Sequence, residues 1–327
     1  MSFRNFRTRL TWIVCLFALM SVQWGCRTLR TNRHTRNLTL ARQLSRRGAG
    51  LLEQENYREA GPLFGEALEH SAADERAHWG MAQVCWQRGE HERAIDHMAK
   101  AGELDGQNPD FFVRLGEMHL ASGNLDEALK QADMVLRQKR QHSLAWALKG
   151  AVHKARAWRE VDPKTREDEY NAALDCYQLA LTHDSNNSAA RIQVAEIYRS
   201  IGKPHRALAT IDYLADGHTI QSLPARAWMV KGQALSDLGE GTDAQDCLRQ
   251  ASMCADPADN ELLLRLAHEQ HKTGNSGEAR LLLGMVLRNN PNDPGALGLQ
   301  GQIGDSFQSD EHFLQGIPAA QRTAPKK

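Results

Sequence analysis

The chain is poor in the residues and patterns on which several protein classes depend. It has six cysteines among 327 residues and none of them forms a Cys-x-x-Cys pair, so neither a disulfide framework nor a zinc site is indicated. Aromatic residues make up 6% of the sequence, and no alternating run rich in valine, isoleucine and threonine predicts a strand. With only ten prolines and with abundant alanine, leucine, glutamate and arginine, the composition favours helices.

Motifs for catalysis are also missing. The sequence contains no Gly-x-Gly-x-x-Gly after a strand, no Gly-x-x-x-x-Gly-Lys-Ser/Thr and no Gly-x-Ser-x-Gly. His268 and His271 are one residue too close for the His-Glu-x-x-His zinc motif, and no third ligand accompanies them. We therefore expect no enzymatic activity, no cofactor, no metal and no small-molecule substrate.

Acidic residues are absent from the N-terminal region. Residues 1–52 contain ten arginines and no aspartate or glutamate, so the rest of this formally neutral chain carries a net charge of about −10. An acidic body disfavours nucleic acid as a partner, because phosphates require a basic surface. The basic N-terminal region instead favours anionic lipid, because an apolar segment lies inside it.

That apolar segment, residues 10–24, follows three arginines and has the layout of an export signal. It is short for a bilayer, whose apolar core a helix crosses with about 20 residues. Residues 1–26 are therefore predicted to be a signal and membrane-targeting segment, and Cys26 resembles the lipidated cysteine of bacterial lipoproteins. This predicts a protein tethered to a membrane of the bacterial cell envelope.

The four arginines between residues 27 and 36 resist translocation, and they keep other possibilities open. Three alternatives to a lipoprotein remain. They are an uncleaved anchor with the body of the protein in the cytoplasm, an ordinary cleaved signal, and a misassigned start of the chain.

Small residues recur along the rest of the chain at a nearly fixed interval. The first three are alanines spaced by 34 residues, and the same slot is filled in each later copy: Ala60, Ala94, Ala128, Ala173, Ala207, Ala244 and Ala279. With this alanine as position 20, seven repeats start at residues 41, 75, 109, 143, 188, 225 and 260. Position 8 is then glycine or alanine in every repeat. Two helices of a hairpin approach closely only if the residues at their contact are small, so the pattern predicts helical hairpins.

The period and the segment of residues 170–187 resemble the tetratricopeptide-repeat family. The resemblance implies an all-α, right-handed superhelical solenoid of about seven helix-turn-helix repeats. We expect a basic linker over residues 27–40, the solenoid over residues 41–304 with a partial capping helix over residues 294–304, and a loose tail over residues 305–327.

The fourth repeat departs from the period, because its alanine arrives 11 residues late. The extra residues either lengthen the turn around residues 158–164 or extend the two helices.

The resemblance also indicates a binding surface. In this family, positions 2, 5, 9 and 12 of each first helix form a concave wall that contacts partner proteins or peptides. The residues that we predict to bind a partner are Arg76, Trp79, Gln83, Trp86, Val113, Glu117, Leu120, Ile192, Arg199, Met229, Leu264 and His268. Trp79 and Trp86 lie seven residues apart on one helix face, where they either anchor a partner or pack against neighbouring helices.

The sequence thus predicts a scaffold that binds proteins in a bacterial envelope assembly. Ser45 and Ala49 replace the lysine and asparagine with which a chaperone-binding subset of the family holds a terminal carboxylate, so that function is not indicated. The alternative is an anchored assembly or regulatory subunit on the cytoplasmic face that positions an enzyme partner.

Overall fold

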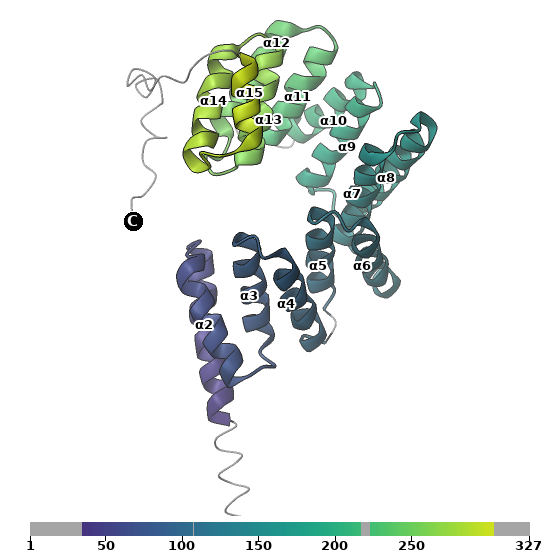
Figure 1. Cartoon of the computed structure of the whole chain (residues 1–327). Coiled ribbons are helices and arrows are strands. Elements are labelled where there is room, and N and C mark those ends of the chain that lie inside the picture. The colour runs from purple at the N-terminus through teal and green to yellow at the C-terminus, as the bar shows by residue number, and fades with distance from the viewer. Residues whose placement is uncertain (1–34, 107, 217–222, 304–327) are drawn as a thin grey trace, which may run out of the picture. The chain divides into compact units, whose positions relative to one another are not determined.

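The computed structural model describes residues 35–106, 108–216 and 223–303, and these residues form two compact units. The first unit ends at Arg140 and the second begins at Gln141. Within the described residues the regular elements are α-helices and none is a strand (Figure 1). The predicted fold class, an all-α solenoid of helical hairpins, is confirmed.

The first unit contains three helical hairpins. Its helices are residues 35–53, α2 (Tyr57–His70), α3 (Glu75–Gln87), α4 (His91–Leu104), α5 (Pro109–Ala121) and α6 (Leu125–Gln138). The second unit contains four further hairpins and a single terminal helix. Its helices are α7 (Ser143–Arg159), α8 (Pro163–His183), α9 (Ser188–Ser200), α10 (Pro204–Asp216), α11 (Ala225–Asp237), α12 (Gly241–Cys254), α13 (Asn260–Lys272), α14 (Ser276–Asn289) and α15 (Pro294–Ile303).

The structure describes only part of the segments that we predict outside the hairpins. Residues 1–26, which include Cys26, and the tail over residues 305–327 lie outside the described residues. Residues 35–40 were expected to be linker but are helical, and Leu40 packs on the first hairpin. The predicted capping helix corresponds to α15 as far as the last described residue, Ile303.

Six first helices, α3, α5, α7, α9, α11 and α13, begin at the residues where the sequence places repeats two to seven. Side-chain caps explain such starts locally. Asp74 accepts a hydrogen bond at Oδ1 from the Ala77 backbone N–H at 2.9 Å, and Asn187 accepts one from Ala190 at 2.9 Å. A cap of this kind pairs one of the backbone donors that have no partner in the first turn.

Close contacts at small residues hold each hairpin together. In the first unit, a Cβ atom added to Gly48 would lie 2.8 Å from Cζ of Phe64, whose ring is fully buried. In the second unit, a Cβ on Gly232 would lie 2.9 Å from Cγ of Leu248 and 3.0 Å from the backbone oxygen of Ala244. These helices therefore touch at distances that only a residue without a side chain permits.

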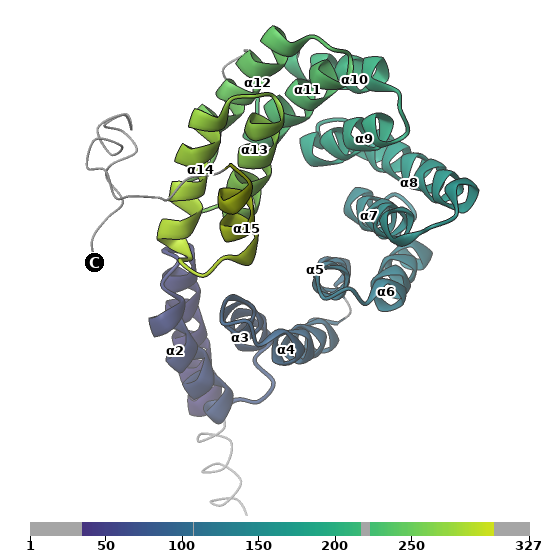
Figure 2. The ribbon, with the colours of Figure 1, turned by 45° about the horizontal axis from the view of Figure 1, so that its top comes forward.

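The helices of the second unit form two layers (Figure 2). We define the first-helix layer as α7, α9, α11, α13 and α15, which contact one another in that order, and the second helices as α8, α10, α12 and α14. The core between the layers is continuous from α9 to α15 and includes Ile211, Leu248, Leu263 and Leu283. Burial of such apolar side chains is the main stabilising term, at about 25 cal/mol per Å².

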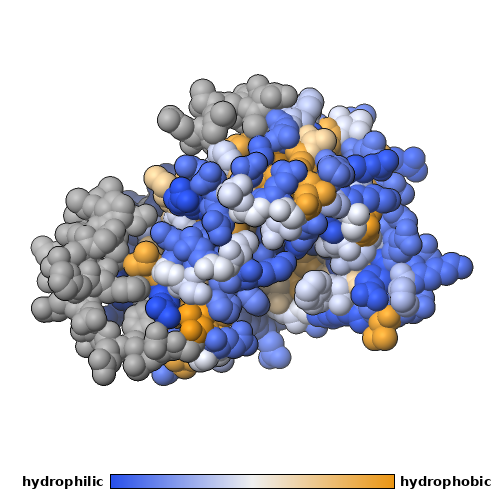
Figure 3. All heavy atoms as spheres, turned by 90° about the horizontal axis from the view of Figure 1, so that it is seen from above, coloured by the Kyte–Doolittle hydropathy of each residue, from blue (hydrophilic) through white to orange (hydrophobic). Residues whose placement is uncertain are grey.

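The surface of the described residues is largely polar. In the view of Figure 3, hydrophilic residues cover most of the face and apolar residues form small separate patches. No helix in the described part of the chain is both long and apolar enough to cross a bilayer.

The extra residues of the fourth repeat extend both helices rather than the turn. Helix α7 has 17 residues and α8 has 21, whereas helices α2–α6 and α9–α15 have at most 14 each. The end of this hairpin therefore extends past α9 (Figures 1 and 2). Its turn is short because Asp162 caps α8, accepting from the Thr165 backbone N–H at 2.8 Å. Trp158 and Val161 at this turn are 83% and 86% exposed.

We expect Gly232→Ala to lower the free energy of unfolding by about 1–3 kcal/mol, because the new methyl group meets a backbone oxygen that cannot move aside cheaply. The matched control is Gly50→Ala, where no atom lies within 4 Å of the added Cβ. That variant should be unchanged or more stable by about 0.5–1 kcal/mol, because alanine favours helix over glycine. Urea unfolding followed by circular dichroism measures both changes. Equal midpoints for the two variants would contradict the close-contact account.

Candidate functional site

The residues predicted to bind a partner all lie on first helices, but they differ in exposure. Arg76, Glu117 and His268 are exposed, and five others are partly buried: Gln83, Trp86, Leu120, Arg199 and Leu264. Trp79 is also partly buried.

Three of the predicted contacts are wrong. Val113, Ile192 and Met229 are 3%, 4% and 0% exposed, so they cannot touch a partner at the surface. Ile192 and Met229 belong to the core of the second unit. The spacing rule placed them correctly on first helices, but side chains at position 5 turn into the packing between adjacent helices here.

The two tryptophans of α3 chiefly support packing in the first unit. Trp79 lies against two apolar clusters, one around Phe64 and one around Met98. Trp86 packs on the second cluster and meets the His91 ring edge to face, with ring centroids 4.4 Å apart. The packing alternative therefore accounts for most of their surface, and partly exposed ring edges remain.

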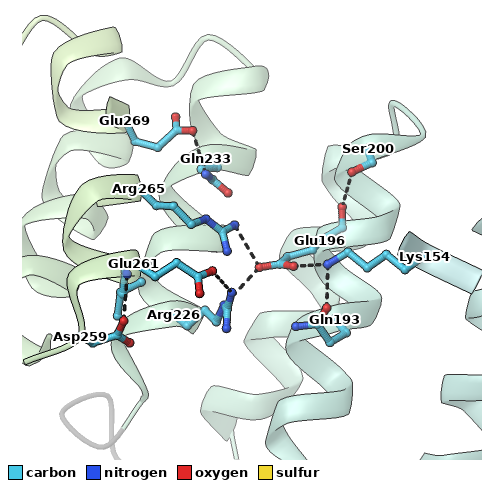
Figure 4. Close-up of polar contacts among 11 residues, drawn as sticks. Lys154, Gln193, Glu196, Ser200, Arg226, Gln233, Asp259, Glu261, Arg265 and Glu269 are labelled. Atoms are coloured by element: carbon cyan, nitrogen blue, oxygen red, sulfur yellow. Dashed lines mark hydrogen bonds and ion pairs between the residues drawn. The ribbon is translucent and has the colours of Figure 1, made fainter. Parts of the chain in front are cut away.

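A cluster of charged side chains joins four helices of the second unit (Figure 4). We call it the Glu196 cluster: Glu196 from α9, Lys154 from α7, Arg226 from α11 and Arg265 from α13. Lys154 donates from Nζ to Glu196 Oε2, and its Nζ also lies 2.6 Å from Gln193 Oε1. Arg265 donates from Nη2 to Glu196 Oε1 at 3.3 Å. Arg226 Nε lies 3.5 Å from the same oxygen as an ion pair.

Burial and the three cations act in opposite directions on the ionisation of this carboxylate. The side chain of Glu196 is 8% exposed, and burial alone would raise its pKa. Lys154, Arg265 and Arg226 outweigh burial and hold the pKa of Glu196 below its ordinary value of 4.5. Burial also lowers the pKa of Lys154, and Glu196 opposes that shift. Glu196 is therefore a carboxylate anion near neutral pH.

Further polar pairs surround the cluster on the same layer. Gln233 Nε2 donates to Glu269 Oε1 at 2.8 Å, and Arg199 Nη1 donates to Asp237 Oδ2 at 3.2 Å. In the first pair, the amide oxygen Oε1 of Gln233 and the second carboxylate oxygen Oε2 of Glu269 are buried and have no hydrogen-bond partner within the described structure. Buried acceptors of this kind are uncommon, because each costs the free energy of its lost hydration.

Sequence reasoning missed the Glu196 cluster in part. Lys154, Glu196 and Arg226 occupy wall positions 12, 9 and 2, but nothing in a single charged residue indicates which other repeat it faces. Arg265 is at position 6, outside the wall pattern, and it reaches across 69 residues of sequence to Glu196. The usable signal is an acidic wall residue with basic wall residues in the repeats on either side.

The described residues offer little for catalysis. No group of three or more His, Cys, Asp or Glu side chains in this part of the chain is placed to hold a metal ion. Cys85, Cys176 and Cys247 are buried and form no disulfide within the described structure, and burial raises the pKa of the Cys85 and Cys247 thiols, which makes these two less reactive.

A family model described as tetratricopeptide repeat matches residues 51–101 and 86–152 of the chain. Cellulose synthase operon protein C of Pseudomonas fluorescens strain SBW25 is 26% identical over 294 residues, which cover 84% of this chain. The chain spans 22% of the length of that relative.

Solved structures share the fold at low sequence identity. A tetratricopeptide repeat protein from Parabacteroides merdae has a TM-score of 0.61 at 12% identity, and the match covers 81% of this chain and 99% of that one. PilW, described as a widely conserved type IV pilus biogenesis factor, has a TM-score of 0.51 at 12% identity, with 80% and 98% covered.

We expect Glu196→Gln to lower the free energy of unfolding by about 1–3 kcal/mol at neutral pH, because three cations lose their shared anion. The folded pKa lies below 4.5, so the stabilisation by Glu196 is present above about pH 4.5 and is lost as the pH falls through the folded pKa. The gap between wild type and variant should therefore shrink on acidification.

The control for this variant is Glu261→Gln, which removes a carboxylate that is 78% exposed. An exposed pair contributes about 0–1 kcal/mol, so this change should be small. Chemical denaturation at several pH values measures both variants. A pH-independent gap for Glu196→Gln would contradict the assigned role.

Proposed function

Because this chain belongs to the tetratricopeptide-repeat family, we propose that it is a non-enzymatic scaffold that binds partner proteins or peptides on its first helices. The observation that carries the proposal is the Glu196 cluster with its neighbouring pairs, which gathers polar groups from α7, α9, α11 and α13 on one layer. Such a layer offers a partner many hydrogen-bonding groups held by a rigid stack.

We place this scaffold in a bacterial envelope assembly, tethered to the membrane through its N-terminus and lipidated at Cys26. Support comes from the apolar segment of residues 10–24 and the cysteine that follows it. The names of two similar proteins, which refer to a cellulose synthase operon and to type IV pilus biogenesis, agree with such a setting.

The second candidate is an anchored regulatory subunit whose solenoid positions an enzyme on the cytoplasmic face. One observation favours it: four arginines directly follow the apolar segment, and positive charge at that place retains a chain on the cytoplasmic side.

Site-specific photo-cross-linking in cells tests the binding face. We expect a cross-linking amino acid at Arg76 or His268, both exposed on first helices, to capture a discrete partner. Glu69 and Arg249, exposed on the second helices α2 and α12, are the matched control positions and should capture much less. Capture mainly at the control positions would place the partner on the opposite layer and refute the proposed face.

Labelling with a palmitate analogue tests the tether. The wild-type protein should incorporate the label, and Cys26→Ser should not, because the lipid would be attached to that thiol. A membrane-bound but unlabelled wild type, with its body protected from protease added outside the inner membrane, would support the anchored cytoplasmic alternative instead.

A further inference from the structure

Charge is unevenly divided between the two layers of the second unit. The first helices α7, α9, α11 and α13 contain ten lysines and arginines and four acidic residues. The second helices contain six basic and nine acidic residues. Helix α7 alone has two lysines and two arginines and no acidic residue. The first-helix layer is therefore basic, although the chain beyond residue 52 carries about −10 overall.

The cations of the Glu196 cluster lie nearer to the surface than their shared anion. Glu196 is 8% exposed, whereas the side chains of Arg226 and Arg265 are 43% and 34% exposed. A molecule that approaches this layer thus meets the guanidinium groups before it meets the carboxylate. Glu196 also reaches all three cations at once, so it fixes where their charged ends lie.

The two guanidinium groups keep donors that the described structure does not use. Arg265 makes a single hydrogen bond, from Nη2 to Glu196. Arg226 approaches only the carboxylates of Glu196 and Glu261, at 3.5 and 3.6 Å. A guanidinium group has five N–H donors in a fixed plane that matches a carboxylate in two places, so both arginines can bind a further anion.

We propose that Lys154, Arg226 and Arg265, positioned by Glu196, form a docking site for an acidic segment of a protein partner. This rests on the proposed scaffold function and specifies the chemistry of the partner. Carboxylates of the segment pair with the free guanidinium donors. The net positive charge of the first-helix layer complements the negative charge of such a segment.

The test measures binding of a fluorescein-labelled oligoglutamate peptide to the full-length chain by fluorescence anisotropy at low salt. Oligoglutamate should bind and oligolysine should not. Arg226→Ala combined with Arg265→Ala should weaken binding about tenfold or more, the loss expected when charge-assisted hydrogen bonds are removed. Arg249→Ala, on the second helix α12, removes one positive charge elsewhere and should change binding little.

Two glutamine variants separate a built site from general attraction between opposite charges. Each removes one negative charge, so general attraction predicts tighter binding of oligoglutamate for both. If Glu196 positions the cations, Glu196→Gln weakens binding, and Glu261→Gln, which releases Arg226, strengthens it. Circular dichroism and the urea midpoint establish that each variant is folded. If Glu196→Gln does not fold, a loss of binding by the double arginine variant together with unchanged binding by Arg249→Ala still separates the built site from general attraction, which predicts a loss for both.

Several results would overturn the proposal. They are equal binding by wild type and the double arginine variant, tighter binding by folded Glu196→Gln, and arginine-dependent binding to phosphatidylglycerol vesicles or oligonucleotides that exceeds binding to oligoglutamate. If the double arginine variant still captures the cross-linked partner of the wild type, only the docking site is wrong. If neither protein captures a partner from its first helices, the scaffold function itself fails.

Discussion

The close approach of the two helices in each hairpin is the constraint on which the rest of the structure depends. Phe64 fills the space that a side chain on Gly48 would need, and Leu248 does the same opposite Gly232. At this distance the apolar side chains interlock with few gaps, and adjacent hairpins share one core from α9 to α15. A wider crossing would leave those side chains partly hydrated and would uncouple one repeat from the next.

Rigid stacking makes a scattered set of charges into a cluster. Because α7, α9, α11 and α13 lie in one layer, residues far apart in sequence come within hydrogen-bonding distance of Glu196. A buried carboxylate is unfavourable alone, since it loses its hydration, and three cations offset that loss. The arrangement therefore fixes the positions of Lys154, Arg226 and Arg265 while leaving part of each guanidinium group open to solvent.

The binding surface was less predictable than the fold. The wall positions that the family resemblance implies assigned Arg76, Glu117 and His268 to exposed places on first helices, and the structure has them there. The same spacing failed for Ile192 and Met229, because whether position 5 faces solvent or a neighbouring helix depends on how far adjacent hairpins rotate against each other. For α3, the cores around Phe64 and Met98 decide how much of Trp79 stays exposed.

The sequence by itself determined the repeat: small residues at positions 8 and 20 and capping residues such as Asp74 are local requirements, so they can be read one hairpin at a time. Only the tertiary structure decided that the extra residues of the fourth repeat extend α7 and α8, because the sequence is equally compatible with a longer turn. It alone also brought Arg265 to Glu196. That contact skips a whole repeat, so it depends on the curvature of the stack. The curvature accumulates from many small packing angles between helices, and the sequence of a single repeat does not specify it.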